Sequence, residues 1–286
     1  MPPDLFLGLL AGLASAAAFG VAAVLQALAA TREPPTRGVD PLLLVRQLRH
    51  LPFLAAMALN LLGFVLHLAA LRTLPLFLAQ ALVSASVVVT AALGTRVLGG
   101  HLHRREALAV GALVVGLALL TSSASTVGDV EPDVGTRSLL LVAVVAVALA
   151  GVAVGRLHGP VGSSLLGLVS GLGFAVTALA SRVLPGFAPA VLVVEPAAYA
   201  LLVGGPLAAL LYSTALQRGA VLTATATVVL GQTVVPALVG VLALGDRLRP
   251  GTAPLAVTGL SLAVVASGVL ARYDPRVLAL EAPAAR

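Results

Sequence analysis

Glu195 is the one acidic residue well inside a long apolar stretch of this sequence, in Val193-Val194-Glu195-Pro196. A charged side chain at the centre of a bilayer costs about 2.5 to 3.5 kcal/mol, so an ionisable group there is a candidate functional residue. Its carboxylate would carry a proton or bind a cationic substrate. The alternative is a structural ion pair with Arg182 or Arg72, which lie near the ends of neighbouring apolar stretches.

Four other polar side chains in the apolar stretches are candidate site residues, namely Asn60, His67, Gln80 and Gln232. Asn60 and His67 are seven residues apart, a spacing that places both on one face of a helix. The amides of Gln80 and Gln232 would line a central path or hold helices together. We expect Glu195, Asn60, His67 and Gln80 to lie in the same half of a bilayer, around a shared polar cavity that binds substrate.

The composition excludes a soluble globular protein. The 286 residues are 59% hydrophobic and 10% charged, with a mean hydropathy of +1.09, whereas soluble domains are about 25% charged. There is no Cys, so thiol chemistry is excluded, and no Gly-rich phosphate loop ending in Lys, which excludes a self-contained ATP-driven pump. The net charge is +6, but the sequence has no long basic run and no Trp, so nucleic-acid binding is not indicated. The charge is better explained as a signal of membrane topology.

Nine apolar stretches are long enough to cross a bilayer as helices, which takes roughly 20 residues each. They lack the alternation of apolar and polar residues that barrel strands require. The sequence therefore predicts an all-α polytopic membrane bundle, in which the first stretch is a retained helix rather than a signal peptide. The predicted spans are 5–30, 52–71, 74–94, 106–122, 138–155, 163–183, 189–211, 220–243 and 253–271.

Arginines in the connections predict the orientation, because basic residues near helix ends stay on the cytoplasmic side. All 17 basic residues are Arg. With the N-terminus outside, twelve arginines lie on the inner side and five on the outer side, the five being Arg72, Arg137, Arg182, Arg247 and Arg249. We therefore expect a plasma-membrane protein with its N-terminus outside and its C-terminus in the cytoplasm.

Three short matches in the same chain order indicate an internal repeat. Residues 8–13 match 167–172, residues 93–97 match 244–248, and Ala70-Leu71 matches Ala215-Leu216. Spans one to four would pair with spans six to nine. Five crossings separate the two sets, so the halves point in opposite directions, as in many secondary transporters. The predicted organisation is a first repeat (1–125), an outer acidic loop and linker helix (126–160), a second inverted repeat (161–272) and a cytoplasmic tail (273–286).

The second half resembles the closing unit of the drug/metabolite transporter superfamily, the EamA-like proteins. The resemblance lies in residues 215–219, Pro236, the segment 245–249 and the helix 259–272. The first half is more similar to the NIPA-type branch, through residues 19–26 and 61–72. The acidic residue usual after Leu-Gly is Asp246 in the second half, but Thr95 stands there in the first. The usual five-helix unit is shortened to four.

The resemblance implies a secondary transporter that moves a small solute by alternating access, not an enzyme. The substrate-binding candidates are Glu195, Asn60, His67, Gln80 and Gln232. A NIPA-like magnesium pathway is the alternative within transport, although Mg²⁺ prefers several oxygen ligands, carboxylates among them. A scaffold or accessory subunit is the alternative of another class. The expected partners are a small molecule or ion and the lipid bilayer, with a homodimer left open; no cofactor or nucleic acid is expected, and no metal is assigned.

Overall fold

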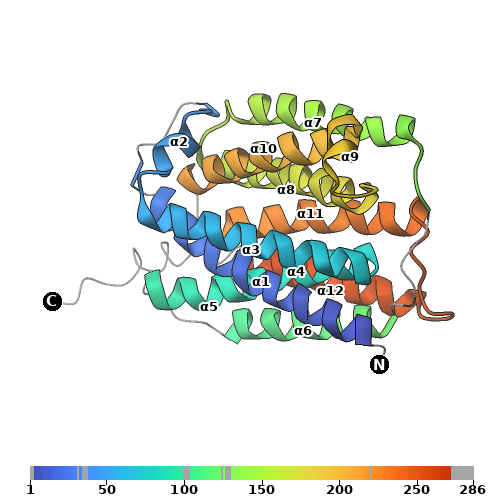
Figure 1. Cartoon of the computed structure of the whole chain (residues 1–286). Helices are drawn as coiled ribbons and strands as arrows, with labels where there is room; N and C mark the ends of the chain where they lie inside the picture. The colour runs from blue at the N-terminus through green and yellow to red at the C-terminus, as the bar shows by residue number, and fades with distance from the viewer. Residues whose placement is uncertain are drawn as a thin grey trace.

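The computed structural model describes residues 3–30, 32–33, 38–98, 104–123, 125, 130–218 and 221–271. These residues form twelve α-helices and no β-strand (Figure 1). The predicted all-α class is confirmed. The tail 273–286 and residues 126–129 of the acidic loop lie outside the described residues. The helices are α1 (Pro3–Ala30), α2 (Leu43–Gln47), α3 (Leu51–Thr73), α4 (Leu76–Ser84), α5 (Ser86–Leu98), α6 (Arg104–Ser123), α7 (Val134–Val154), α8 (Gly159–Val183), α9 (Pro189–Val194), α10 (Pro196–Arg218), α11 (Val221–Leu242) and α12 (Ala253–Ala271).

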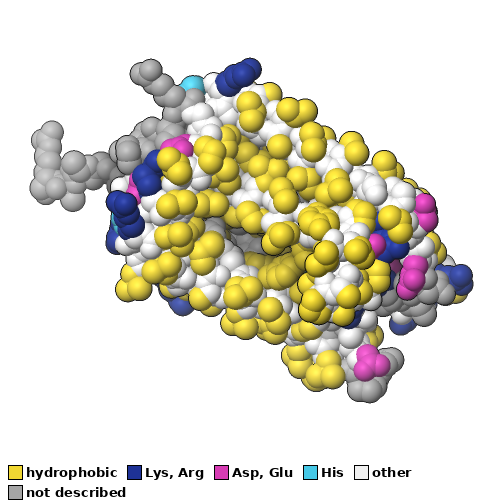
Figure 2. All heavy atoms as spheres, turned by 45° about the horizontal axis from the view of Figure 1, so that its top comes forward, with side chains coloured by type: hydrophobic (Ala, Val, Ile, Leu, Met, Phe, Trp, Pro, Cys, Tyr) yellow, Lys and Arg dark blue, Asp and Glu magenta, His cyan; other side chains and the backbone are white. Residues whose placement is uncertain are grey.

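Five of these helices are long and apolar enough to cross a membrane: α1, α3, α7, α8 and α10. Shorter apolar stretches occur within α4–α5, α6, α11 and α12. Many large apolar side chains on the outside are exposed, including Val142 and Leu149 on α7. Figure 2 shows apolar side chains across the middle of one face and most charged side chains toward its two ends. A surface of this kind suits lipid rather than water, so the chain is a membrane protein.

Two predicted spans are interrupted. The span 189–211 is divided into α9 and α10 at Glu195, whose backbone is extended (φ −89°, ψ 120°). The cause is Pro196, because a proline disfavours the helical conformation of the residue before it. The span 74–94 is divided into α4 and α5 at Ala85, where the Ala85 N–H bonds to Leu82 O in a tighter i to i+3 turn.

Helix α7 begins at Val134, earlier than the predicted start at residue 138. The Asp133 side chain accepts hydrogen bonds from the backbone N–H groups of Gly135 and Thr136, which satisfies the free amides of the first turn. A hydrogen bond from the Thr136 hydroxyl is the largest cause that holds the pKa of the Asp133 carboxyl below its usual value, and the two backbone hydrogen bonds lower this pKa further. Arg137 therefore lies in the first turn of α7 rather than in the connection before it.

The helices run back and forth between two ends of the bundle. We call the end at which α1 begins the N-terminal end. There α3, α6, α8 and α11 finish, and α4, α7, α10 and α12 begin (Figure 1). Within the bundle, α1 packs along α3 and α5, α8 packs along α10 and α11, and α6 packs along α12. The core is made largely of small residues and Leu, such as Ala79, Leu166 and Ala208, which allows these close approaches.

The crossing of α6 and α12 is built on two glycines in matching surroundings. A Cβ at Gly116 would lie 2.7 Å from Gly259 O, and a Cβ at Gly259 would lie 2.7 Å from Gly116 O. The next nearest atoms also correspond, with Ala263 N and Leu262 Cβ beside Gly116, and Leu120 N and Leu119 Cβ beside Gly259. All three residue pairs differ by the same 143 positions, so the contact has local two-fold symmetry.

Gly116→Ala is expected to lower the free energy of unfolding by about 1–3 kcal/mol, because the new methyl group meets backbone atoms of α12 that cannot rotate away. The control is Gly111→Ala in the same helix, where no atom lies within 4 Å of the added Cβ. That variant should gain up to about 1 kcal/mol, since Ala favours a helix more than Gly does. Thermal unfolding in detergent, followed by circular dichroism, compares the two. Equal effects would contradict the close approach.

Candidate functional site: an arginine-lined pocket at the N-terminal end

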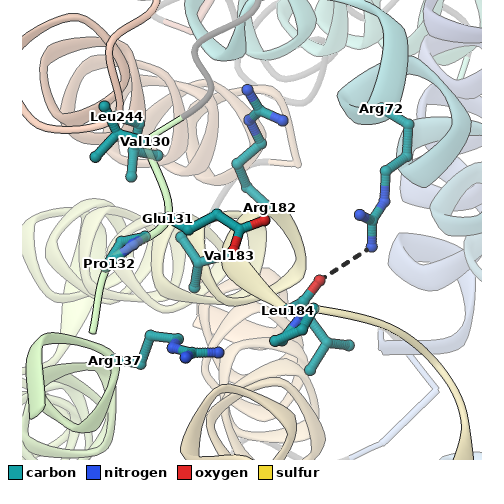
Figure 3. Close-up of a pocket in the computed structure, with 10 residues that line it drawn as sticks. Arg72, Val130, Glu131, Pro132, Arg137, Arg182, Val183, Leu184 and Leu244 are labelled. Atoms are coloured by element: carbon teal, nitrogen blue, oxygen red, sulfur yellow. Dashed lines mark hydrogen bonds between the residues drawn. The ribbon is translucent and has the colours of Figure 1, made fainter. Parts of the chain in front are cut away.

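A pocket of about 230 Å³ opens at the N-terminal end of the bundle. Its charged lining residues are Arg72 from α3, Arg137 from α7, Arg182 from α8, and Glu131 from the segment before α7 (Figure 3). The pocket thus lies where elements of both halves of the sequence meet. The apolar part of its lining consists of Val130, Pro132, Val183, Leu184, Pro185 and Leu244.

The Arg137 guanidinium forms a salt bridge with Glu195. One guanidinium nitrogen of Arg137, Nη1, lies 2.9 Å from each oxygen of the Glu195 carboxylate. The two side chains are only 15% and 8% exposed, so water screens the pair little. Glu195 reaches Arg137 because Pro196 interrupts the helix at this position. Arg137 lies within the first turn of α7 because Asp133 starts that helix early. The predicted pairing of Glu195 with Arg182 or Arg72 was wrong, because Arg182 binds Asp246 and Arg72 binds the carbonyl oxygen of Leu184.

Arg182 is held by Asp246, the acidic residue after Leu-Gly that carries part of the family resemblance. The Asp246 side chain is completely buried and lies 3.5 Å from Arg182 Nη2. Its other oxygen accepts a hydrogen bond of 2.5 Å from the backbone N–H of Leu76, the first residue of α4. Asp246 therefore connects α8, α4 and the turn after α11. Its acidic type following a Leu-Gly pair was the available signal.

Arg72 is held without a carboxylate in the described part of the chain. Its Nη2 donates to the carbonyl oxygen of Leu184 at 3.3 Å, a bond drawn in Figure 3. Its guanidinium also lies 5.5 Å from the centre of the Phe187 ring, a favourable cation–π distance. Both contacts come from the segment that follows α8. They orient Arg72 beside the pocket, and no carboxylate among the described residues forms an ion pair with it.

Four of the predicted site residues have described side chains, and none of these four lines the pocket. Asn60 is half-buried and His67 is buried on α3, in a region where Gly63 faces the Phe19 ring of α1. Gln232 is half-buried on α11, which packs against α4, the helix of Gln80. The Gln80 side chain lies outside the described residues. Glu195 is bound to α7, so the structure separates it from the α1–α3 interface that contains His67.

The opposite end of the bundle has its own polar contacts. The Arg218 guanidinium donates to the carbonyl oxygens of Gly155, Leu157 and Gly38, which joins α10 to two connections. In the connection between α1 and α3, Glu33 binds His50 at 2.9 Å and Arg46 at 3.2 Å. The hydrogen bond with His50, and then Arg46, keep the pKa of the Glu33 carboxyl below its usual value. These contacts hold the short helix α2 against the bundle.

In comparisons with protein-family models, with curated proteins and with solved structures, nothing matches this chain. The assignment of a function therefore depends on its residues and on the geometry described above. Guanidinium groups donate hydrogen bonds and do not act as general bases at physiological pH. The pocket is accordingly suited to binding rather than to proton abstraction by its arginines.

Proposed function

We propose that this chain is a secondary transporter of the drug/metabolite transporter superfamily, EamA-like, which moves a small solute across the plasma membrane by alternating access. The observation that carries the proposal is the symmetric contact of Gly116 with Gly259. A two-fold relation between α6 and α12 is what two inverted halves produce where their last helices meet. The proposed halves are residues 1–125 and 161–272, joined by 126–160.

Two serines in corresponding positions support the repeat. The Ser15 hydroxyl of α1 donates to Gly63 O of α3, and the Ser170 hydroxyl of α8 donates to Ala208 O of α10, both at 2.8 Å. Gly63 precedes Ala70 by seven residues and Ala208 precedes Ala215 by seven, in agreement with the predicted match of Ala70-Leu71 to Ala215-Leu216.

The serines also shift the match between α1 and α8 by one helical turn. In this register Gly-Leu-Ala-Ser (12–15) corresponds to Gly-Leu-Val-Ser (167–170), instead of 8–13 to 167–172. Residues 93–97 and 244–248, which the sequence matched, have different secondary structure. The first segment lies within α5, whereas the second follows the end of α11.

Nine membrane crossings follow if each interrupted helix counts as one pass, α4 with α5 and α9 with α10. The five long apolar helices and the four shorter apolar stretches give the same number. Successive passes alternate in direction. The proposed orientation keeps the N-terminal end, with its arginine-lined pocket, on the outer side.

A magnesium pathway has less support from the structure. Mg²⁺ sites in proteins are built on carboxylates and waters. The two carboxylates buried near the pocket, Glu195 and Asp246, are each bound to an arginine. An anionic or neutral solute fits this arrangement better than a divalent cation does.

The natural absence of Cys allows a direct test of topology and transport. With Ser125→Cys at the N-terminal end and Arg156→Cys at the opposite end, an impermeant maleimide applied to intact cells should label only the first. The reverse pattern would overturn the orientation. Purified protein in proteoliposomes should then take up labelled solutes from a screen that includes Mg²⁺. Uptake of none, with correctly inserted protein, would favour the scaffold alternative.

A further inference from the structure

Each of the three arginines of the pocket is fixed by a neighbouring group, and for two of them that group is a carboxylate that does not line the pocket. Glu195 and Asp246 hold Arg137 and Arg182 but are absent from the lining, and Leu184 O with the Phe187 ring orients Arg72. Side chains fixed in advance lose little conformational entropy when a ligand binds. The pocket is thus built to present guanidinium groups to its contents.

Glu131 is the single acidic side chain in the described lining. It is exposed, and its carboxylate points into the pocket from the segment before α7 (Figure 3). No salt bridge of Glu131 is found within the described part of the chain, although three guanidinium groups share the pocket with it. Its carboxylate therefore lies among the arginines without being bound as tightly as Glu195 or Asp246.

We propose that this pocket binds a small organic oxyanion, a carboxylate or a phosphate ester, through Arg72 together with Arg137 and Arg182. The Glu131 carboxylate points into the same pocket without a salt bridge to a described residue, and it moves aside when the ligand binds. Planar guanidinium groups match carboxylate and phosphate oxygens with paired hydrogen bonds. Calling this ligand the substrate rests on the proposed transport function, whereas its binding does not.

The size and lining of the pocket narrow the ligand further. A volume of about 230 Å³ holds a small metabolite, and the wall contains six apolar or proline residues. An anion with a short aliphatic part would place its charge on the arginines and its carbons against Val183, Leu184 and Leu244. Arg137 and Arg182 keep their carboxylates, and Arg72 has no salt bridge to a described residue, so Arg72 supplies the charge that the ligand neutralises.

Calorimetric titration of the full chain in an uncharged detergent tests the site, at constant ionic strength in sodium chloride. Succinate and inorganic phosphate are the probes, and succinamide is the uncharged control. We expect both anions to bind and succinamide not to bind. Arg72→Gln should weaken binding about tenfold or more, because a charge-assisted hydrogen bond is lost. Glu131→Gln should strengthen it about fivefold, since a nearby like charge is removed.

The matched control is Arg249→Gln, an exposed arginine at the same end of the bundle that does not line the pocket. The affinity of the Arg249→Gln variant for succinate and phosphate should equal that of the unaltered protein. The proposal is overturned if neither anion binds, if succinamide binds equally well, or if Arg249→Gln weakens binding as much as Arg72→Gln.

A lipid headgroup is a second source of the same chemistry. Binding of dihexanoyl phosphatidylglycerol, but of neither succinate nor phosphate, would assign the pocket to lipid and overturn the small-solute proposal. Anion binding in a protein that moves no solute would reject transport and retain the site. Transport of an uncharged solute without anion binding would reject the oxyanion site and retain transport.

Discussion

Asp246→Ala is expected to lower the free energy of unfolding by about 3–5 kcal/mol, the range found when one partner of a buried ion pair is removed. The change leaves the Arg182 guanidinium without this carboxylate and the Leu76 N–H without its acceptor. Both groups lie in a region from which water is largely excluded. Unfolding in mixed micelles with increasing dodecyl sulfate, followed by circular dichroism, measures the loss.

Two further variants separate the contributions. Asp246→Asn keeps an oxygen for Leu76 but removes the charge that binds Arg182, so its loss should be intermediate. Asp4→Ala removes an exposed carboxylate at the same end of the bundle and should cost less than about 1 kcal/mol. If Asp246→Ala were as stable as Asp4→Ala, the connection of α8, α4 and the turn after α11 would not hold the bundle together.

The pair Arg137–Glu195 should show strong coupling in a double-mutant cycle. Glu195→Leu and Arg137→Met each leave one buried charge alone, and each should cost about 3–5 kcal/mol. The double variant replaces both charges with apolar groups of similar volume and should be close to the unaltered protein in stability. Losses that simply add would show that the two groups do not interact.

The double variant also tests the role of this ion pair in transport. Because that protein remains folded, its uptake activity reports on the two charged groups rather than on stability. Loss of uptake would support a role of Glu195 or Arg137 in moving solute. Normal uptake would make the pair structural and contradict both the sequence-based prediction for Glu195 and the binding role proposed for Arg137.

The course of the helices was predictable because few residue types mark their ends. Prolines and arginines flank most of the apolar stretches, and the ends of α3, α6, α8, α11 and α12 lie within a few residues of the predicted ones. The interruption at Glu195 also had a signal in Pro196, since the residue before a proline is disfavoured in a helix. The early start of α7 had its own signal in Asp133, a good N-cap residue.

The site was less predictable, because its members are far apart in the chain. Arg72, Arg137 and Arg182 were expected on one side of the membrane, but their convergence depends on how α3, α7 and α8 pack. The polar residues Asn60 and His67 share a helix face, as predicted. Their distance from Glu195 follows from helix neighbours, which hydrophobic patterns do not specify.

The bond between Asp246 and Leu76 has a consequence for the way this protein is made. Its two residues are 170 positions apart. The ribosome therefore finishes the start of α4 long before it produces the carboxylate that accepts a hydrogen bond from its first amide. During synthesis that amide must remain bonded to water or to the translocation machinery. A nascent chain stalled before residue 246 could pack α4 against α1, α3 and α6 but would lack the acceptor for this amide, and quality-control proteases would meet it in that state.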